Sequence, residues 1–174
     1  LMELGIPVVM AVNMIDIMEK SGDKISIKDL KESLGCEVVE ISALKGKGIK
    51  EAANKAVELA KKPNHEMVHK FDKKVEDAIE KVEEKIAFDI PKEQQRFFAI
   101  KLLERDDKIK EQMKTVPDVE NEIKQLEDAF DDDTESIITN ERYTYISSVI
   151  GKCVSKGNKG ELTTSDKIDK IVTN

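Results

Sequence analysis

The first part of the chain alternates between apolar runs and amphipathic stretches. Residues 6–12 form a continuous, valine-containing apolar run, and residues 36–41 form a second, shorter one. Runs of this length are typical of strands that are buried on both faces of a parallel sheet. Apolar residues at helical spacing occur over 25–34 and over 49–61. The order strand, helix, strand, helix predicts parallel strands joined by right-handed crossovers.

The second part of the chain has helical periodicity only. Four or five helices among residues 65–174 predict a small bundle that follows the α/β part. We expect a helix to start at Pro91, which suits a first turn, and another to end at the acidic triplet 131–133. The apolar positions that define the helices lie within 71–86, 97–103, 119–130, 143–154 and 168–172.

The composition changes at a Pro-Asn pair after residue 62. Residues 1–62 carry ten basic and ten acidic residues, whereas residues 63–174 carry 19 basic and 26 acidic residues and hold the whole net charge of −7. All seven aromatic residues also lie in the second part. We therefore expect two domains, an α/β domain over 1–64 and an all-α domain over 65–174.

Composition and charge narrow the class of protein. The chain is 39% hydrophobic and has no apolar run near the roughly 18 residues that a membrane-spanning helix needs. Its acidic net charge makes it a poor partner for nucleic acid or anionic lipid. Cys36 and Cys153 form neither a zinc-binding spacing nor a disulfide framework, which fits a reducing cytosol.

Polar and small residues follow both predicted strands directly, where ligand sites of parallel α/β sheets lie. Asp16 can accept hydrogen bonds from the N1–H and the 2-amino group of guanine, and adenine offers neither donor. Asn13 can brace its loop and reach the base edge, while the small Ala43 lets a backbone N–H approach the guanine oxygen. The candidate guanine-binding residues are Asn13, Met14, Asp16, Ser42, Ala43 and Leu44.

An isolated Asn-x-x-Asp segment has a simpler interpretation, which is a turn that caps a helix. Here two segments occur as a pair, and each follows an apolar strand. This pairing favours guanine recognition, with Ser42 holding the second loop.

No metal site is predicted. Three pairs of acidic or histidine residues have spacings that suggest metal ligands: Glu37 with Glu40, Glu80 with Glu83, and His65 with His69. Acidic pairs of this kind are common on solvated helix faces, and residues three apart on a strand point to opposite faces. No carboxylate or cysteine completes the histidine pair at a recognisable spacing.

The two segments resemble the last two guanine-recognition boxes of small GTPase domains. Met14 stands where these boxes usually have lysine, and a methionine can still cover the base face without adding charge. This form, followed by an acidic helical domain, is similar to the ferrous iron transport protein B (FeoB) family. Further stretches that resemble the family lie at 3–9, 99–104, 142–143 and 162–169.

The resemblance implies a membrane protein for Fe²⁺ uptake, whose cytosolic part is a GTPase domain followed by a helical domain that modulates nucleotide binding. This chain would be the carboxyl-terminal half of a P-loop GTPase sheet followed by a small helical bundle, at the cytoplasmic face of the membrane. The implied partners are GTP or GDP, the upstream half of the GTPase domain and the membrane permease domain of the same protein. A homo-oligomer is also possible, because a second copy can cover the open edge of the half-sheet.

Two motifs of GTPases are absent from the sequence. It contains neither the phosphate loop G-x-x-x-x-G-K-[ST] nor the D-x-x-G box that positions Mg²⁺ and the γ-phosphate. We expect both in the intact parent, upstream of Leu1, so that this chain is a fragment without catalytic residues that is inactive alone. The competing hypothesis is a non-catalytic helical interaction module that carries a remnant α/β scaffold.

Overall fold

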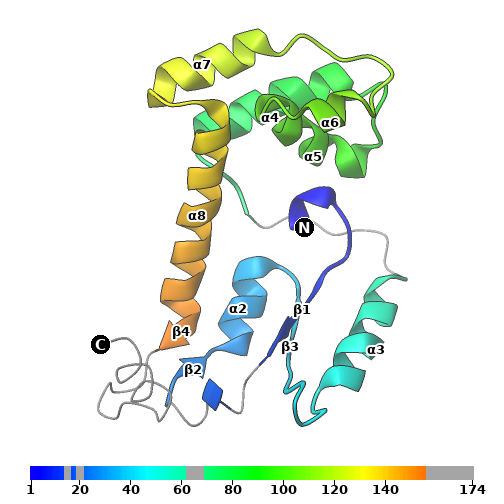
Figure 1. The fold of residues 1–174 in the computed structure, drawn as a ribbon, viewed down its shortest axis with the longest axis vertical. Coiled ribbons are helices and arrows are strands. Elements are labelled where there is room, and N and C mark those ends of the chain that lie inside the picture. The colour runs from blue at the N-terminus through cyan, green and yellow to red at the C-terminus, as the bar shows by residue number, and fades with distance from the viewer. Residues whose placement is uncertain (14–16, 19–21, 62–68, 156–174) are drawn as a thin grey trace, which may run out of the picture. The chain divides into compact units, whose positions relative to one another are not determined.

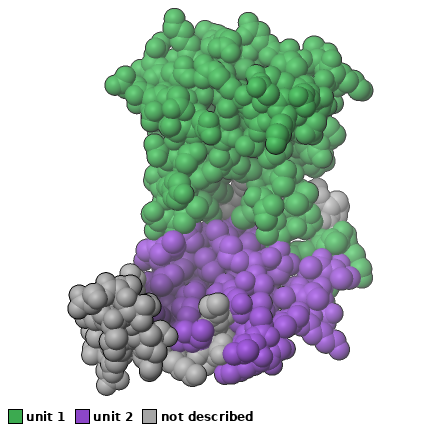
Figure 2. Space-filling model, viewed as in Figure 1, with its two compact units in different colours: residues 1–8, 58–148 green, residues 9–57, 149–174 purple. Residues whose placement is uncertain are grey.

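The protein forms two compact units, which Figure 2 colours separately. The helical unit comprises residues 1–8 and 58–148, and the α/β unit comprises residues 9–57 and 149–174. The chain therefore passes between the units after residues 8, 57 and 148. The structure is a computed structural model that describes residues 1–13, 17–18, 22–61 and 69–155.

The α/β unit is built on a pair of parallel strands (Figure 1). β1 (Val9–Val12) pairs with β3 (Glu37–Glu40) in parallel. α2 (Ile27–Leu34) lies between them in sequence, and α3 (Ile49–Leu59) follows β3. The parallel pair and its helices confirm the α/β class that the apolar runs predict, and the helices of the second part confirm the change to an all-α region.

A second, antiparallel pairing joins distant stretches of the α/β unit. β2 (Lys24–Ile25) pairs with β4 (Val154–Ser155). The Ser26 N–H also donates a hydrogen bond to the Cys153 carbonyl oxygen at 2.8 Å. The outermost residues of two predicted helices therefore lie in short strands, because tertiary pairing overrides local periodicity.

The ends of α2 follow from its local sequence. The Ser26 side chain accepts a hydrogen bond from the Asp29 N–H at 3.3 Å and caps the helix start. Gly35 ends the helix in a left-handed conformation with φ of 66°, which only glycine adopts without strain. The helix therefore begins two residues later than the apolar spacing alone predicts and ends where Gly35 predicts.

The helical unit is a small bundle. Its helices are α4 (Lys73–Ile86), α5 (Lys92–Leu103), α6 (Asp107–Lys110), α7 (Glu120–Phe130) and most of α8 (Thr134–Cys153). Their apolar stripes meet in one core, whose most buried members include Val75, Ile79, Val82, Ile86, Ile100, Leu102, Leu103, Ile123 and Ile138. Among the described residues no helix is both long and apolar enough to cross a lipid bilayer.

Two features of the helical unit differ from the expected pattern. α6 is a single turn, which is too short to carry a recognisable periodicity. α8 starts at Thr134 instead of near 143, because Asp133 accepts a hydrogen bond from the Ser136 N–H at 2.9 Å and caps the helix. The predicted helix at 168–172 lies outside the described residues.

The start of the chain packs with the helices. η1 (Met2–Leu4) contacts α5, although it precedes β1 in sequence. The two compact units therefore interleave along the chain, whereas the expected domains, 1–64 and 65–174, are contiguous.

Candidate functional site

The carboxyl ends of β1 and β3 lie side by side. Val12, the last residue of β1, is opposite Glu40, the last residue of β3. One residue further, the Ile41 N–H donates a hydrogen bond to the Val12 carbonyl oxygen at 2.8 Å. The in-register pairing brings the loops that follow the two strands to the same edge of the sheet. Asn13 begins the first loop and Ser42 begins the second.

A side-chain hydrogen bond joins the two loops. The Asn13 Oδ1 accepts a hydrogen bond from the Ala43 N–H at 3.1 Å, across a separation of 30 residues. Both residues are exposed, so the pair lies at the surface of the α/β unit. The structure thus brings together Asn13 and Ala43, which sequence analysis assigned to the same base.

Ser42 anchors the second loop. It is only 1% exposed, and its Oγ accepts a hydrogen bond from the Lys45 N–H at 3.4 Å. Its backbone exchanges two hydrogen bonds of 3.1 Å with Lys47, which closes a tight turn. Leu44 stands at the tip of this turn and is 92% exposed. The turn therefore fixes Ala43 and leaves the Leu44 side chain in solvent.

Glycine is required where this turn leads into α3. Gly48 has φ of 75°, and a Cβ at this position would overlap the Glu40 carbonyl oxygen. The close approach ties the end of the turn to the end of β3. From the sequence, residues 45–48 are expected to form a flexible loop into a helix, and their alternating glycines are the signal for the tight turn.

Two candidate residues, Met14 and Asp16, lie outside the described residues. The described part of the site consists of Asn13, Ser42 and Ala43, with Leu44 beside them. The exposed polar groups there are the Asn13 side-chain amide and the Ala43 N–H, which pair with each other.

Glu37, the first residue of β3, is paired with two lysines of the α/β unit. Glu37 forms ion pairs with Lys31 at 2.5 Å and with Lys55 at 3.5 Å, which tie β3 to α2 and α3. The hydrogen bond from Lys31 and the charges of both lysines hold the pKa of Glu37 below its ordinary value. Burial, and secondarily the charge of Glu37, raises the pKa of the neighbouring Cys36 thiol. The Glu37 carboxylate is therefore held in ion pairs with lysines.

The described residues contain no cluster of three or more His, Cys, Asp or Glu side chains that could hold a metal ion. His69 stacks on Tyr145 with ring centroids 3.7 Å apart and meets Phe71 edge-on. His65 lies outside the described residues.

Two protein families match the chain, and together they cover most of it. Residues 1–56 match the family described as ferrous iron transport protein B, and residues 71–155 match the one described as the FeoB cytosolic helical domain. The chain belongs to the FeoB family. The resemblance stated from the sequence is thereby confirmed.

Curated relatives support the FeoB assignment. The Fe(2+) transporter FeoB of Escherichia coli (strain K12) is 37% identical over 107 residues, which cover 61% of this chain and 14% of that protein. An Fe(2+) transport protein A/Fe(2+) transporter FeoB fusion protein of Porphyromonas gingivalis is 30% identical over 99% of this chain and 22% of its own length. The chain therefore spans less than a quarter of these relatives.

Solved FeoB structures have the same fold. A mutant of S. thermophilus NFeoB bound to GDP superimposes with a TM-score of 0.82 and 34% identity, over 88% of this chain and 60% of that one. Another mutant, bound to GMPPNP, gives a TM-score of 0.78 and 35% identity, over 84% of this chain and 59% of that one. Both helical and α/β parts of this chain are thus FeoB-like.

Proposed function

We propose that this chain carries the guanine-recognition site of a GTPase that serves a ferrous iron transporter. Asn13, Asp16 and the turn at 42–44 would form the base site, with Met14 against the base face. The observation that carries the proposal is the Asn13–Ala43 hydrogen bond, because it joins the two loops at the carboxyl ends of paired parallel strands. The relatives bound to GDP and GMPPNP support a guanine nucleotide as the ligand.

Base binding requires an exchange of hydrogen-bond partners. The Ala43 N–H donates to Asn13 Oδ1, so guanine O6 would take the place of that amide oxygen. The Asn13 side-chain N–H₂ would then be free to donate to N7, and Asp16 would accept from N1–H and the 2-amino group. Adenine has an amino group where guanine has O6, so it would set two donors against each other. The site would therefore discriminate against adenine both at the position of O6 and at N1 with the 2-amino group.

Phosphate and Mg²⁺ binding belong, in this proposal, to polypeptide outside these 174 residues. The sequence has no phosphate loop and no D-x-x-G box, and the chain covers only 60% of the GDP-bound relative. The helical unit would modulate nucleotide binding, and the assembled protein would act at the cytoplasmic face of the membrane together with its permease domain.

Nucleotide titration of the isotope-labelled 174-residue chain tests the proposal. We expect GDP to shift the NMR signals of the Ala43 amide and the Asn13 side-chain amide, with a dissociation constant of roughly 1 mM, about −4 kcal/mol. ADP should leave both signals in place. Asp16→Asn should weaken GDP binding about tenfold or more, since a charged hydrogen bond is lost, and should favour xanthosine diphosphate, whose 2-carbonyl accepts from an amide.

Asp29→Asn is the matched control, because it removes the same charge from α2 at a distance in sequence from both loops. It should preserve the preference for GDP. Equal responses to GDP and ADP would overturn guanine recognition and favour a helical interaction module. A micromolar dissociation constant would reveal a phosphate site within the chain.

A further inference from the structure

Residues 1–8 are built into the helical unit by close backbone packing. Gly5 has φ of 68°, and a Cβ at this position would overlap the Glu93 carbonyl oxygen in α5. Only glycine allows both the left-handed conformation and this approach. The segment that leads into β1 therefore rests directly on the helices before the strand begins at Val9.

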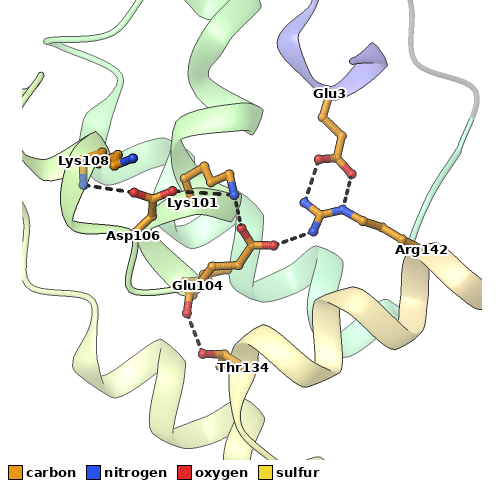
Figure 3. A network of polar contacts seen from close by, with 8 residues as sticks. Glu3, Lys101, Glu104, Asp106, Lys108, Thr134 and Arg142 are labelled. Carbon is orange, nitrogen blue, oxygen red and sulfur yellow. Dashed lines mark hydrogen bonds and ion pairs between the residues drawn. The ribbon is translucent and has the colours of Figure 1, made fainter.

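A charged clamp holds the same segment, and Figure 3 shows it from close by. Glu3, in η1, accepts two hydrogen bonds from the Arg142 guanidinium, at 3.0 Å and 2.8 Å. The same guanidinium donates to Glu104 at 2.5 Å. Glu104 also pairs with Lys101 at 2.6 Å, and Lys101 approaches Asp106 at 3.6 Å. We call Glu3, Arg142 and Glu104 the clamp.

The clamp is partly withdrawn from water, which strengthens its hydrogen bonds. The exposed fractions of the side chains are 20% for Glu3, 31% for Arg142 and 5% for Glu104. Burial alone would raise the pKa of Glu3, but the hydrogen bonds and charge of Arg142 outweigh it and lower that pKa. The hydrogen bond with Glu3 in turn raises the pKa of Arg142.

The clamp joins residues that precede two of the three points at which the chain passes between the units. Glu3 lies just before the passage after residue 8, and Arg142 lies in α8 just before the passage after residue 148. Beyond the first passage lie β1 and, directly after it, Asn13. Beyond the second, the Cys153 carbonyl oxygen accepts the hydrogen bond from Ser26.

Glu104 is paired with both Arg142 and Lys101. When Arg142 releases Glu3, Lys101 still neutralises the buried Glu104. Releasing Glu3 therefore leaves no buried carboxylate unpaired, and the Glu3 carboxylate can enter water.

We propose that Arg142 is a positioning residue, which sets the geometry of the Asn13–Ala43 pair by holding Glu3 and thereby the start of β1. This inference rests on the proposed function, since the site that it positions is the guanine site. A closed clamp fixes β1 and favours the loop arrangement that binds the base. An open clamp loosens β1 and weakens binding without any contact between Arg142 and nucleotide.

Amide hydrogen exchange of the 174-residue chain, without nucleotide, tests the positioning role directly. Glu3→Gln and Arg142→Gln should each speed exchange about tenfold at the amides of β1 and at Ala43, while α4 keeps its protection. The double variant should exchange no faster in β1 than either single variant, because both single variants already remove the Glu3–Arg142 contact. Arg142→Lys should recover only part of the protection, since a lysine cannot form the two-pronged contact.

Glu127→Gln is the matched control. It disrupts another two-pronged ion pair of the helical unit, with Arg105, that involves no residue of 1–8. It should leave exchange in β1 unchanged. Wild-type exchange in β1 for both Glu3→Gln and Arg142→Gln would overturn the proposal. Because Glu3→Gln keeps the Arg142–Glu104 pair, it decides the question even if Arg142→Gln unfolds the helices.

Titration with GDP separates this inference from the proposed function. If both hold, Glu3→Gln should raise the dissociation constant for GDP several-fold, and Glu127→Gln should not. If wild-type chain ignores GDP while β1 exchange responds to the clamp, guanine recognition fails and the positioning role stands. If GDP binds equally well to wild type and Glu3→Gln, the proposed function stands and the positioning of the guanine site fails.

Discussion

At the scale of single residues, Gly46 and Gly48 are a matched pair in the turn that leads into α3. Both have left-handed backbone, with φ of 65° and 75°. A Cβ would meet open space at Gly46, but it would overlap the Glu40 carbonyl oxygen at Gly48. We expect Gly46→Ala to cost about 1 kcal/mol of unfolding free energy through backbone strain alone. Gly48→Ala adds the overlap and should cost roughly 2–4 kcal/mol.

Urea titrations followed by the NMR signals of β3 measure this difference. Each variant is compared with wild type and with the other. Equal costs would contradict the close approach between the turn and the end of β3.

His69 makes the stability of the helical unit depend on pH. Burial, and then the charge of Arg96, lowers the pKa of His69 from 6.5. Its ring packs between Phe71 and Tyr145, where a proton is disfavoured. Below about pH 6.5 the unfolded chain binds that proton more tightly than the folded chain, so the unfolding free energy should fall as the pH falls until the folded histidine also titrates.

His69→Phe keeps an aromatic ring and removes the titration. Thermal unfolding of this variant between pH 7.5 and pH 5 should show a smaller decrease in stability than wild type. Parallel pH profiles for wild type and His69→Phe would refute the assignment of the pH-dependent stability to His69.

At the scale of elements, α8 carries isoleucines in opposite environments. Ile138 is fully buried in the helical core, whereas Ile146 is 47% exposed on the same helix. Ile138→Ala should lower the unfolding free energy by about 2–5 kcal/mol, because it leaves a cavity. Ile146→Ala should cost less than about 1 kcal/mol, since its side chain already contacts water. Denaturant unfolding followed by circular dichroism compares them, and similar costs would contradict the packing of α8.

The sequence predicted those elements whose ends are set locally. The apolar runs predicted β1 and β3, and Gly35 predicted the end of α2, whereas its start after the Ser26 cap lies two residues later than the apolar spacing predicts. The pairing of β2 with β4 was not predictable, because two residues carry no periodicity and their partners lie in another part of the chain. The start of α8 was not predicted, because the apolar positions that indicate this helix begin at Tyr143, beyond the capping Asp133.

For the candidate site, the sequence predicted that two loops would meet at one sheet edge. The contact between Asn13 and Ala43 lies there, because register follows from strand pairing. The clamp had no comparable signal. Glu3 and Arg142 lie in stretches that resemble the FeoB family, but they are single charges separated by 139 residues, and nothing in the sequence pairs them.

At the scale of the whole molecule, β1 presents an apolar strand with an open edge. Among the strands that the structure describes, β1 pairs only with β3, and Met10 on β1 is 36% exposed. Unpaired N–H and C=O groups on such an edge favour pairing with another chain. We expect the 174-residue chain to self-associate at high concentration, measured by size-exclusion chromatography with light scattering.

Two comparisons sharpen this experiment. Met10→Lys should reduce the association, because a charge on an edge strand disfavours pairing. Residues 65–174, which lack the strand, should remain monomeric. A monomeric long chain at every concentration would contradict the prediction.

The clamp also has a consequence for the order in which the molecule assembles during synthesis. Glu3 and Arg142 are 139 residues apart, and at about 5–20 residues per second a ribosome needs roughly 7–28 s to make the stretch between them. The core residues of α4, α5 and α7 are all synthesised within that interval, before Arg142 exists. The Glu3–Arg142 contact, which holds the first segment to be synthesised, is therefore among the last to form. In a nascent chain β1 lacks this attachment until α8 has left the ribosome.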